Sequence, residues 1–213
     1  MTMHRQWLSP GRRVLALGAV ASMAGGAALA STVGAQANSL LAVTSTADVA
    51  DATPGDATCD TPALSAAAGA CTFRAAARTA QNLSGTTTIQ LPAGTITLKL
   101  GEIPTDSNVI IVGQGVAQTT IDAAKKSRVL DTDCTVGTAH TVALSNLTLQ
   151  NGDATKPGLN VGIGGGIITC GTMLSLNNVL IQKNHASFGG GVATYAPLTV
   201  TGSTFHMNSA AGG

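Results

Sequence analysis

The strongest constraint on how this 213-residue chain can fold is a glycine triplet that recurs. Gly164–Gly166 and Gly189–Gly191 start twenty-five residues apart, each leads into an aliphatic run, and a glycine pair at 212–213 starts a third repeat. An Asn-x-Ala element precedes the second and third glycine runs, at 184–186 and at 208–210. A period of this length, carried by short runs of alternating apolar residues, is typical of a solenoid built from stacked coils.

The first thirty-seven residues have the pattern of an export signal. Arg5, Arg12 and Arg13 form a basic start, an apolar run follows at 14–30, and small residues suited to cleavage end that run and recur at 35–37. The run is short and glycine-rich for a membrane span, although an uncleaved anchor stays open. The Arg12-Arg13 pair allows a twin-arginine signal, whereas the flanking residues favour general secretion. We expect an exported protein, extracellular or at the cell surface or envelope, without a membrane span after signal removal.

Charge and aromatic content argue against nucleic acid as a partner. Charged residues make up 10% of the chain and aromatic residues 2%. Removal of the signal takes three of eleven basic residues and leaves eight against ten acidic ones, so the mature net charge is near −2. Binding to nucleic acid needs a basic footprint and stacking aromatics, and neither is present. We interpret the short basic run Lys125–Arg128 as a solvated turn between strands.

Residues 38–85 differ from the rest of the mature chain because they include a helical pattern. A strand is predicted at 40–46, and an acidic loop with the turn signal Pro54-Gly55 follows at 48–60. Thr72 fits a helix N-cap. The residues after it have the apolar spacing of an amphipathic helix, namely Phe73, Ala76, Ala77 and Ala80. We interpret the acidic loop as a solvated connector, since its spacing does not match a calcium loop.

From residue 86 onward, short β-type runs alternate with turn residues. Three of these runs share one inside–outside alternation: Val142–Leu144, Leu174–Leu176 and Leu198–Val200. The same alignment predicts two stacked asparagine pairs, Asn146 with Asn178 and Asn184 with Asn208. Amides stacked in this way can hydrogen-bond along the axis of a solenoid.

These repeats resemble those of polymorphic outer membrane proteins and related bacterial β-helix proteins. The segment Cys71–Ala76 resembles the CSLREA motif, which commonly precedes such repeats in secreted or surface proteins. Ala75 stands where the motif has Glu, so any cap or ion pair made by that Glu is absent here. The resemblance covers about residues 40–213. It implies an all-β fold, a right-handed parallel β-helix (a pectate-lyase-like solenoid) with an N-terminal capping strand and amphipathic helix.

The organisation we predict has three parts. Residues 1–37 form the signal peptide, 38–85 form the N-terminal cap with the CSLREA-like helix, and 86–213 form the parallel β-helix coils. Since the glycine pair at 212–213 starts a repeat that nothing completes, we expect either that the coils continue beyond residue 213 or that the open end pairs with something else.

Four cysteines in an exported chain predict two disulfides. Cys59 and Cys71 flank the loop before the helix and form the local pair. Cys134 and Cys170 occupy the same place in successive coils, and the spacing of parallel strands brings such cysteines within bonding distance. Two free buried thiols are the alternative for this second pair. A metal site is disfavoured, because no two cysteines have the short spacing of a zinc knuckle.

Catalytic signals in the coils are weak. Asp131 and Asp133 lie two apart on one face of a strand, and paired carboxylates are what a glycosidase needs. No further acid recurs at this place in the next coils, so we treat them as weak catalytic candidates. His140, His185 and His206 have no neighbour in sequence that resembles a triad or a metal cluster, and we interpret them as solvated. We predict no cofactor and no metal.

The function we expect is that of a non-catalytic, structural or adhesin-like protein at the cell surface or outside the cell. Its partners would be carbohydrate or a host or cell-surface protein. The alternative is a polysaccharide lyase or glycoside hydrolase of the β-helix class whose catalytic coils lie beyond residue 213. A third possibility is a spacer that holds another domain away from the envelope.

Overall fold

Strands pair in parallel with strands of the neighbouring repeat in the structure, a computed structural model that describes residues 38–63, 65, 67–132, 139–156 and 162–212. The predicted export signal at 1–37, Asp133 and Cys134 lie outside the described residues. All twelve ladders between the described strands are parallel. The described part of the chain is therefore mostly strand in parallel sheets, with one helix.

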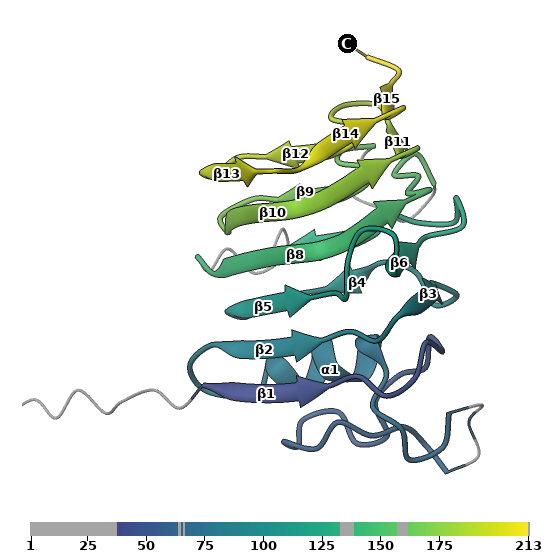
Figure 1. The fold of residues 1–213 in the computed structure, drawn as a ribbon, viewed down its shortest axis with the longest axis vertical. Helices are drawn as coiled ribbons and strands as arrows, with labels where there is room; N and C mark the ends of the chain where they lie inside the picture. Colours follow the sequence, from purple (N-terminus) through teal and green to yellow (C-terminus); the bar gives the residue numbers. More distant parts are fainter. Residues whose placement is uncertain (1–37, 64, 66, 133–138, 157–161, 213) are drawn as a thin grey trace, which may run out of the picture. The chain divides into compact units, whose positions relative to one another are not determined.

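The largest sheet contains nine strands (Figure 1). Its main path follows chain order through β1 (Ser39–Ala42), β2 (Thr87–Gln90), β5 (Val109–Val112), β8 (Thr141–Gln150), β10 (Met173–Gln182) and β13 (Leu198–Thr201). We call the strands that one repeat contributes to the stack a rung. Three more strands extend the rungs of this sheet, namely β3 (Gly94–Thr97), β6 (Thr119–Asp122) and β14 (Thr204–His206).

Two smaller parallel sheets complete the described strands. The first has four strands, in the order β12 (Val192–Thr194), β9 (Ile167–Thr169), β7 (Leu130–Thr132) and β4 (Ile103–Pro104). The second pairs β11 (His185–Ala186) with β15 (Ser209–Ala210). Each segment thus lies on its equivalent in the neighbouring repeat, as the alternation in the sequence predicts.

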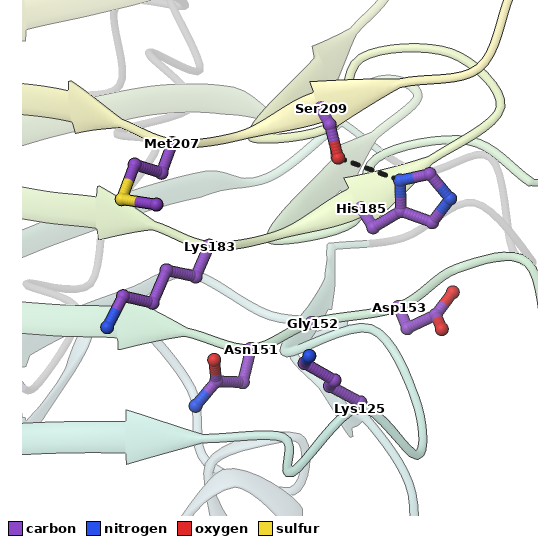
Figure 2. Close-up of a pocket in the computed structure, with 8 residues that line it drawn as sticks. All are labelled: Lys125, Asn151, Gly152, Asp153, Lys183, His185, Met207 and Ser209. Carbon is purple, nitrogen blue, oxygen red and sulfur yellow. Dashed lines mark hydrogen bonds between the residues drawn. The ribbon is translucent and has the colours of Figure 1, made fainter.

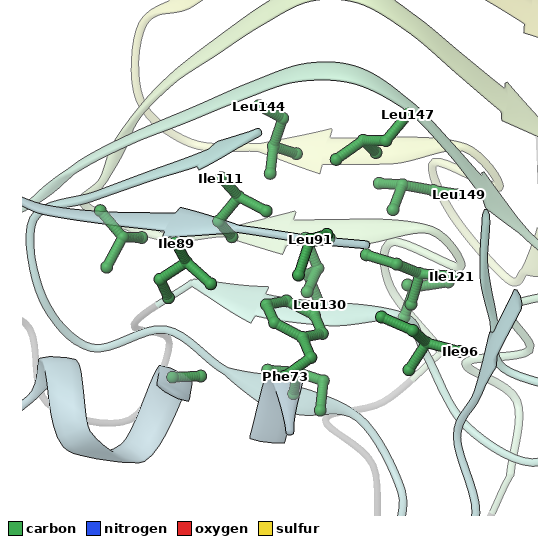
Figure 3. Packing of buried hydrophobic residues seen from close by; sticks show 14 of the residues in the cluster. Phe73, Ile89, Leu91, Ile96, Ile111, Ile121, Leu130, Leu144, Leu147 and Leu149 are labelled. Carbon is green, nitrogen blue, oxygen red and sulfur yellow. The ribbon is translucent and has the colours of Figure 1, made fainter. Parts of the chain in front are cut away.

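The core consists of columns of aliphatic side chains, one from each strand. Ile89, Ile111, Leu144, Leu176 and Val200 are consecutive register partners. The first four are almost fully buried, and Val200 in β13 is 44% exposed. Figure 3 shows how such side chains from different strands point into the same interior. Alternate residues point outward, which is why short β-branched runs suffice for each strand.

The glycine triplets are required because the backbones of successive repeats come into close contact. Gly166 N–H donates to Gly190 O at 3.1 Å, and Ile167 N–H donates to Gly191 O at 3.0 Å. A Cβ on Gly165 would lie 2.4 Å from the carbonyl oxygens of Gly190 and His185. No side chain fits at such distances, and this explains the repeat that dominates the sequence.

The helix α1 (Phe73–Ala80) forms where the apolar spacing predicts it. Thr72 caps it by accepting a hydrogen bond from Ala75 N–H at 3.2 Å. The helix packs against β2 and β4, and Phe73 is fully buried. Cys59 and Cys71 form the predicted disulfide.

Two interpretations of the N-terminal region are wrong in part. The strand expected at 40–46 is shorter, since β1 is Ser39–Ala42. The acidic loop is not simply a solvated connector, because Asp48 and Asp51 are buried. Asp48 accepts hydrogen bonds from Lys99 N–H and Leu100 N–H at 2.6 and 2.8 Å, so its carboxylate holds a neighbouring turn. Sequence spacing did not reveal this role, because the partners lie about fifty positions away.

Candidate functional site

A depression of about 440 Å³ lies where strands of the largest sheet end and the two-stranded sheet begins (Figure 2). We call it the corner groove, and its lining residues are Lys125, Asn151, Gly152, Asp153, Lys183, His185, Met207 and Ser209. These residues come from four successive repeats. They are brought together by the stacking of the chain, so no local motif marks them in the sequence.

The first column of the groove consists of residues in the left-handed backbone conformation. Lys125, Asn151, Lys183 and Met207 have φ values of 57°, 55°, 55° and 54°. Backbone hydrogen bonds tie them into successive rungs, for example from Lys125 N–H to Asn151 O at 2.7 Å. Asparagine tolerates this conformation well, whereas lysine and methionine are held in it at a cost of about 1 kcal/mol each or more. These residues form a bend between two strands of each rung. The left-handed conformation at this bend is therefore imposed by the hydrogen bonds between rungs rather than by the preference of each residue.

A ladder of inward-facing amides lies directly beneath the groove. Asn184 is fully buried. Its Oδ1 accepts from Gly152 N–H at 2.7 Å, and its Nδ2 donates to Asn208 Oδ1 at 3.0 Å. Because Asn184 points inward, Lys183 and His185 on either side of it point outward, and this alternation gives the groove two parallel columns.

The second column consists of Asp153, His185 and Ser209. Asp153 and His185 form a parallel bridge, and β11 pairs His185 with Ser209 of β15. His185 Nδ1 lies 2.8 Å from Ser209 Oγ, as Figure 2 shows. The expectation that His185 belongs to no triad or metal cluster is not contradicted by this contact, but its pairing with a serine of the next repeat was not anticipated. The sequence contained a signal for this contact. The repeat aligns Asn184 with Asn208, and the same register places His185 beside Ser209.

Asp153 is held by other residues than His185. Its Oδ1 accepts from Thr155 N–H at 3.0 Å and from Thr155 Oγ1–H at 2.6 Å, and its Oδ2 lies 3.0 Å from Lys156 Nζ. Burial alone would raise the pKa of this carboxyl, but the hydrogen bonds from Thr155 and Lys156 outweigh it and lower the pKa below its ordinary value. A triad needs the acid to orient the imidazole. The described contacts form a His–Ser pair instead.

The asparagine pairs expected from the repeat lie within hydrogen-bonding distance. Asn178 Nδ2 donates to Asn146 Oδ1 at 2.8 Å on the exposed side of a second bend of the rungs, where both asparagines have a left-handed backbone. Asn208 Nδ2 donates to Ile181 O at 2.8 Å, beside its contact with Asn184. The amides thus link neighbouring rungs at both bends.

Of the two weak catalytic candidates, Asp131 does not line the corner groove. Asp131 is buried, and its Oδ2 lies 3.5 Å from Arg128 Nη1. Asp133 and Cys134 lie outside the described residues, so the proposed carboxylate pair and the Cys134–Cys170 bond stay predictions. A buried, paired carboxylate is the ordinary state of a structural ion pair.

Arg128 corrects the interpretation of 125–128 as a solvated turn. Its side chain is fully buried and donates to Glu102 Oε2 at 2.6 Å and to Gly164 O at 2.8 Å. Burial raises the pKa of Glu102, and the nearby Arg128 charge opposes the rise without cancelling it. Lys125 and Lys126 are exposed, as expected. The sequence does not distinguish Arg128 from the two nearby lysines, so it could not predict that only the arginine among them is buried.

The described residues contain no group of three or more His, Cys, Asp or Glu side chains placed to hold a metal ion. Within the same part of the chain, we find no helix that is both long and apolar enough to cross a membrane.

No protein-family model, curated protein or solved structure matches this chain.

Proposed function

We propose that the parallel sheets belong to a right-handed parallel β-helix of the CSLREA and polymorphic outer membrane protein type, with residues 38–85 as its N-terminal cap. The order in which the chain visits the sheets supports this proposal. From β10 it passes to β11 in the two-stranded sheet, to β12 in the four-stranded sheet, and back to β13 beside β10. Parallel connections are almost always right-handed. An experimental structure with hairpins, or with the opposite hand, would contradict the proposal.

The function we propose is that of an exported, non-catalytic, adhesin-like binding protein at the cell surface or outside the cell. The observation that carries it is the corner groove, in which ammonium, amide, carboxylate, imidazole and hydroxyl groups from successive rungs line one face. Such a face can contact an extended ligand at several points at once, and several weak contacts then add up to useful affinity. The ligand is a carbohydrate or a cell-surface protein.

Export is tested by expressing the full chain in a bacterial host and determining the N-terminus of the product by mass spectrometry. We expect a mature protein that begins after Ala30 or after Ala37 and lies outside the cytoplasm. Full-length protein that stays in the cytoplasm would contradict the exported role.

Binding is tested with the mature chain on glycan arrays and on intact cells. We expect retention of a ligand without any change to it. A second candidate function, a carbohydrate-active enzyme, is favoured by the contact between His185 and Ser209. Polysaccharide breakdown that is lost in His185→Gln or Asp131→Asn would establish the enzyme and overturn the adhesin role.

A further inference from the structure

Resting on the proposed binding function, we propose that the corner groove binds an acidic polysaccharide. Lys125 and Lys183 hold its carboxylate or sulfate groups, and the neighbouring polar side chains hold its hydroxyls.

The two bends of the rungs use different residues for the same backbone conformation. At the bend outside the corner groove, the left-handed positions are Asn146, Asn178 and Gly202, with φ values of 56°, 52° and 56°. These are the residue types that adopt this conformation most readily. At the corner groove, Asn151 is the one such residue in the column, and Lys125, Lys183 and Met207 hold the same conformation. Because the backbone gains nothing from lysine there, the reason for lysine lies in its side chain.

The two ammonium groups are placed to act together. Lys125 and Lys183 lie on either side of Asn151 in the column, so two rungs separate them. Parallel strands are spaced by about 4.8 Å, so their Cα atoms are roughly 10 Å apart. Both side chains are exposed, and neither forms an ion pair within the part of the chain that the structure describes. They therefore present two cations, on long flexible stems, along one line.

The acids near the groove are already bound to other groups. Asp153 is paired with Lys156 and accepts from Thr155. Asp122 accepts from Asn151 Nδ2 at 3.0 Å and from Gln150 Nε2 at 2.9 Å. An incoming anion therefore meets one acid whose charge is offset by Lys156 and one whose oxygens are occupied by amide donors, together with two cations that form no ion pair among the described residues.

The other lining groups suit a sugar rather than a nucleic acid. Ser209 Oγ and the imidazole of His185 offer a donor and acceptors for hydroxyls, and Met207, which is 66% exposed, offers an apolar surface for a sugar ring. None of the residues that line the groove is Phe, Tyr or Trp, and its one aromatic ring, the imidazole of His185, is hydrogen-bonded to Ser209. Binding to single-stranded nucleic acid depends on aromatic stacking, so an acidic polysaccharide is the polyanion that fits.

The test compares the mature chain with Lys125→Asn/Lys183→Asn. Asparagine removes both charges and is comfortable in the left-handed conformation, so we expect the variant to remain folded. The control, Arg78→Gln/Lys99→Gln, removes two exposed charges that do not line the corner groove. Titration calorimetry uses polygalacturonate as the carboxylated polymer, heparin as the sulfated one and dextran as the neutral one. Circular dichroism and thermal unfolding check the fold of each variant.

We expect the mature chain to bind at least one of the two acidic polymers and not dextran, with affinity that falls as salt is raised. The lysine variant should lose roughly tenfold in affinity, the effect of two exposed charge contacts, while the control changes less than twofold by the same reasoning. The polymer that binds identifies the anionic group as carboxylate or sulfate.

Each contrary outcome shows whether the acidic-polysaccharide proposal, the broader proposal of an adhesin-like binding function, or both must be abandoned. Equal affinity in the lysine variant and the wild type would overturn the groove as the site. Binding to dextran or to a cell-surface protein, with none to either acidic polymer, would overturn the acidic ligand and leave the adhesin role standing. Breakdown of a polymer would overturn both.

Discussion

At the scale of single residues, buried polar groups determine how tightly the rungs are joined. Asn184 is the clearest case, since its side chain replaces backbone pairing at a bend where the strands are interrupted. It is fully buried and joins three successive repeats through Gly152, Leu149 and Asn208. A buried polar group of this kind is costly to leave unpaired and stabilising when fully paired.

We predict that Asn184→Ala lowers the free energy of unfolding by about 2–3 kcal/mol, because Gly152 N–H and Leu149 O lose a buried partner. Urea unfolding followed by circular dichroism measures the change. The matched control is Asn178→Gly, which removes an exposed amide contact and keeps the left-handed backbone. Equal losses in the two variants would show that burial of the amide is not what matters.

The pKa of Asp153 predicts an acid dependence of stability. Because the folded pKa is below the ordinary value of 3.8, the stabilisation is present above that value and is lost as pH falls through the folded pKa. Asp153→Asn should therefore show a weaker loss of stability in this acid range than the wild type. Unfolding midpoints measured between neutral pH and the acid limit provide the comparison, and parallel curves would contradict the assignment.

At the scale of elements, the loop that follows β1 is attached to the rest of the fold through ionic contacts as well as through α1 and the disulfide. Arg74 on α1 donates to Asp48 Oδ1 at 2.6 Å and to Glu102 O at 2.9 Å. Asp48 also binds the turn at 99–100. The carboxylate thus joins three segments that are far apart in the sequence.

We predict that Asp48→Ala destabilises the fold by about 3–5 kcal/mol, since Arg74 would be left with a largely buried, unpaired charge. Asp56→Ala is the matched control in the same loop, because Asp56 accepts only one exposed bond, from Thr58 N–H at 2.8 Å, among the hydrogen bonds of the described residues. Thermal and denaturant unfolding measure both. A loss below about 1 kcal/mol in Asp48→Ala would place this ion pair among ordinary surface pairs.

The sequence predicts the helix, the strand register and the local disulfide, because each follows from short-range spacing or from a regular repeat. The inward turn of Arg128 and the burial of Asp48 could not be predicted in this way. Their partners lie in other segments of the chain. The identity of a charged residue does not reveal whether its side chain is solvated or paired. The corner groove could be predicted in part. No local motif marks its residues, but the register of the stacked strands determines which of them lie next to one another.

At the scale of the whole molecule, position in the stack decides what a residue contributes. Leu174 in β10 and Leu198 in β13 are register partners, yet Leu174 is 2% exposed and Leu198 is 37% exposed. β10 has paired strands on both sides, whereas β13 ends the order of its sheet among the described strands. In a stack of repeats, each repeat is stabilised mainly by its neighbours.

Leu174→Ala and Leu198→Ala therefore remove the same side chain from two positions that differ only in what covers them. We predict that Leu174→Ala lowers the free energy of unfolding by about 3 kcal/mol, through lost burial and a cavity between rungs, and that Leu198→Ala lowers it by about 1 kcal/mol or less because much of its surface is already in water. Urea unfolding of the 213-residue chain measures both variants. Equal losses would mean that the last rung is as well covered as the interior ones, and the stack of neighbour-dependent repeats would have to be abandoned.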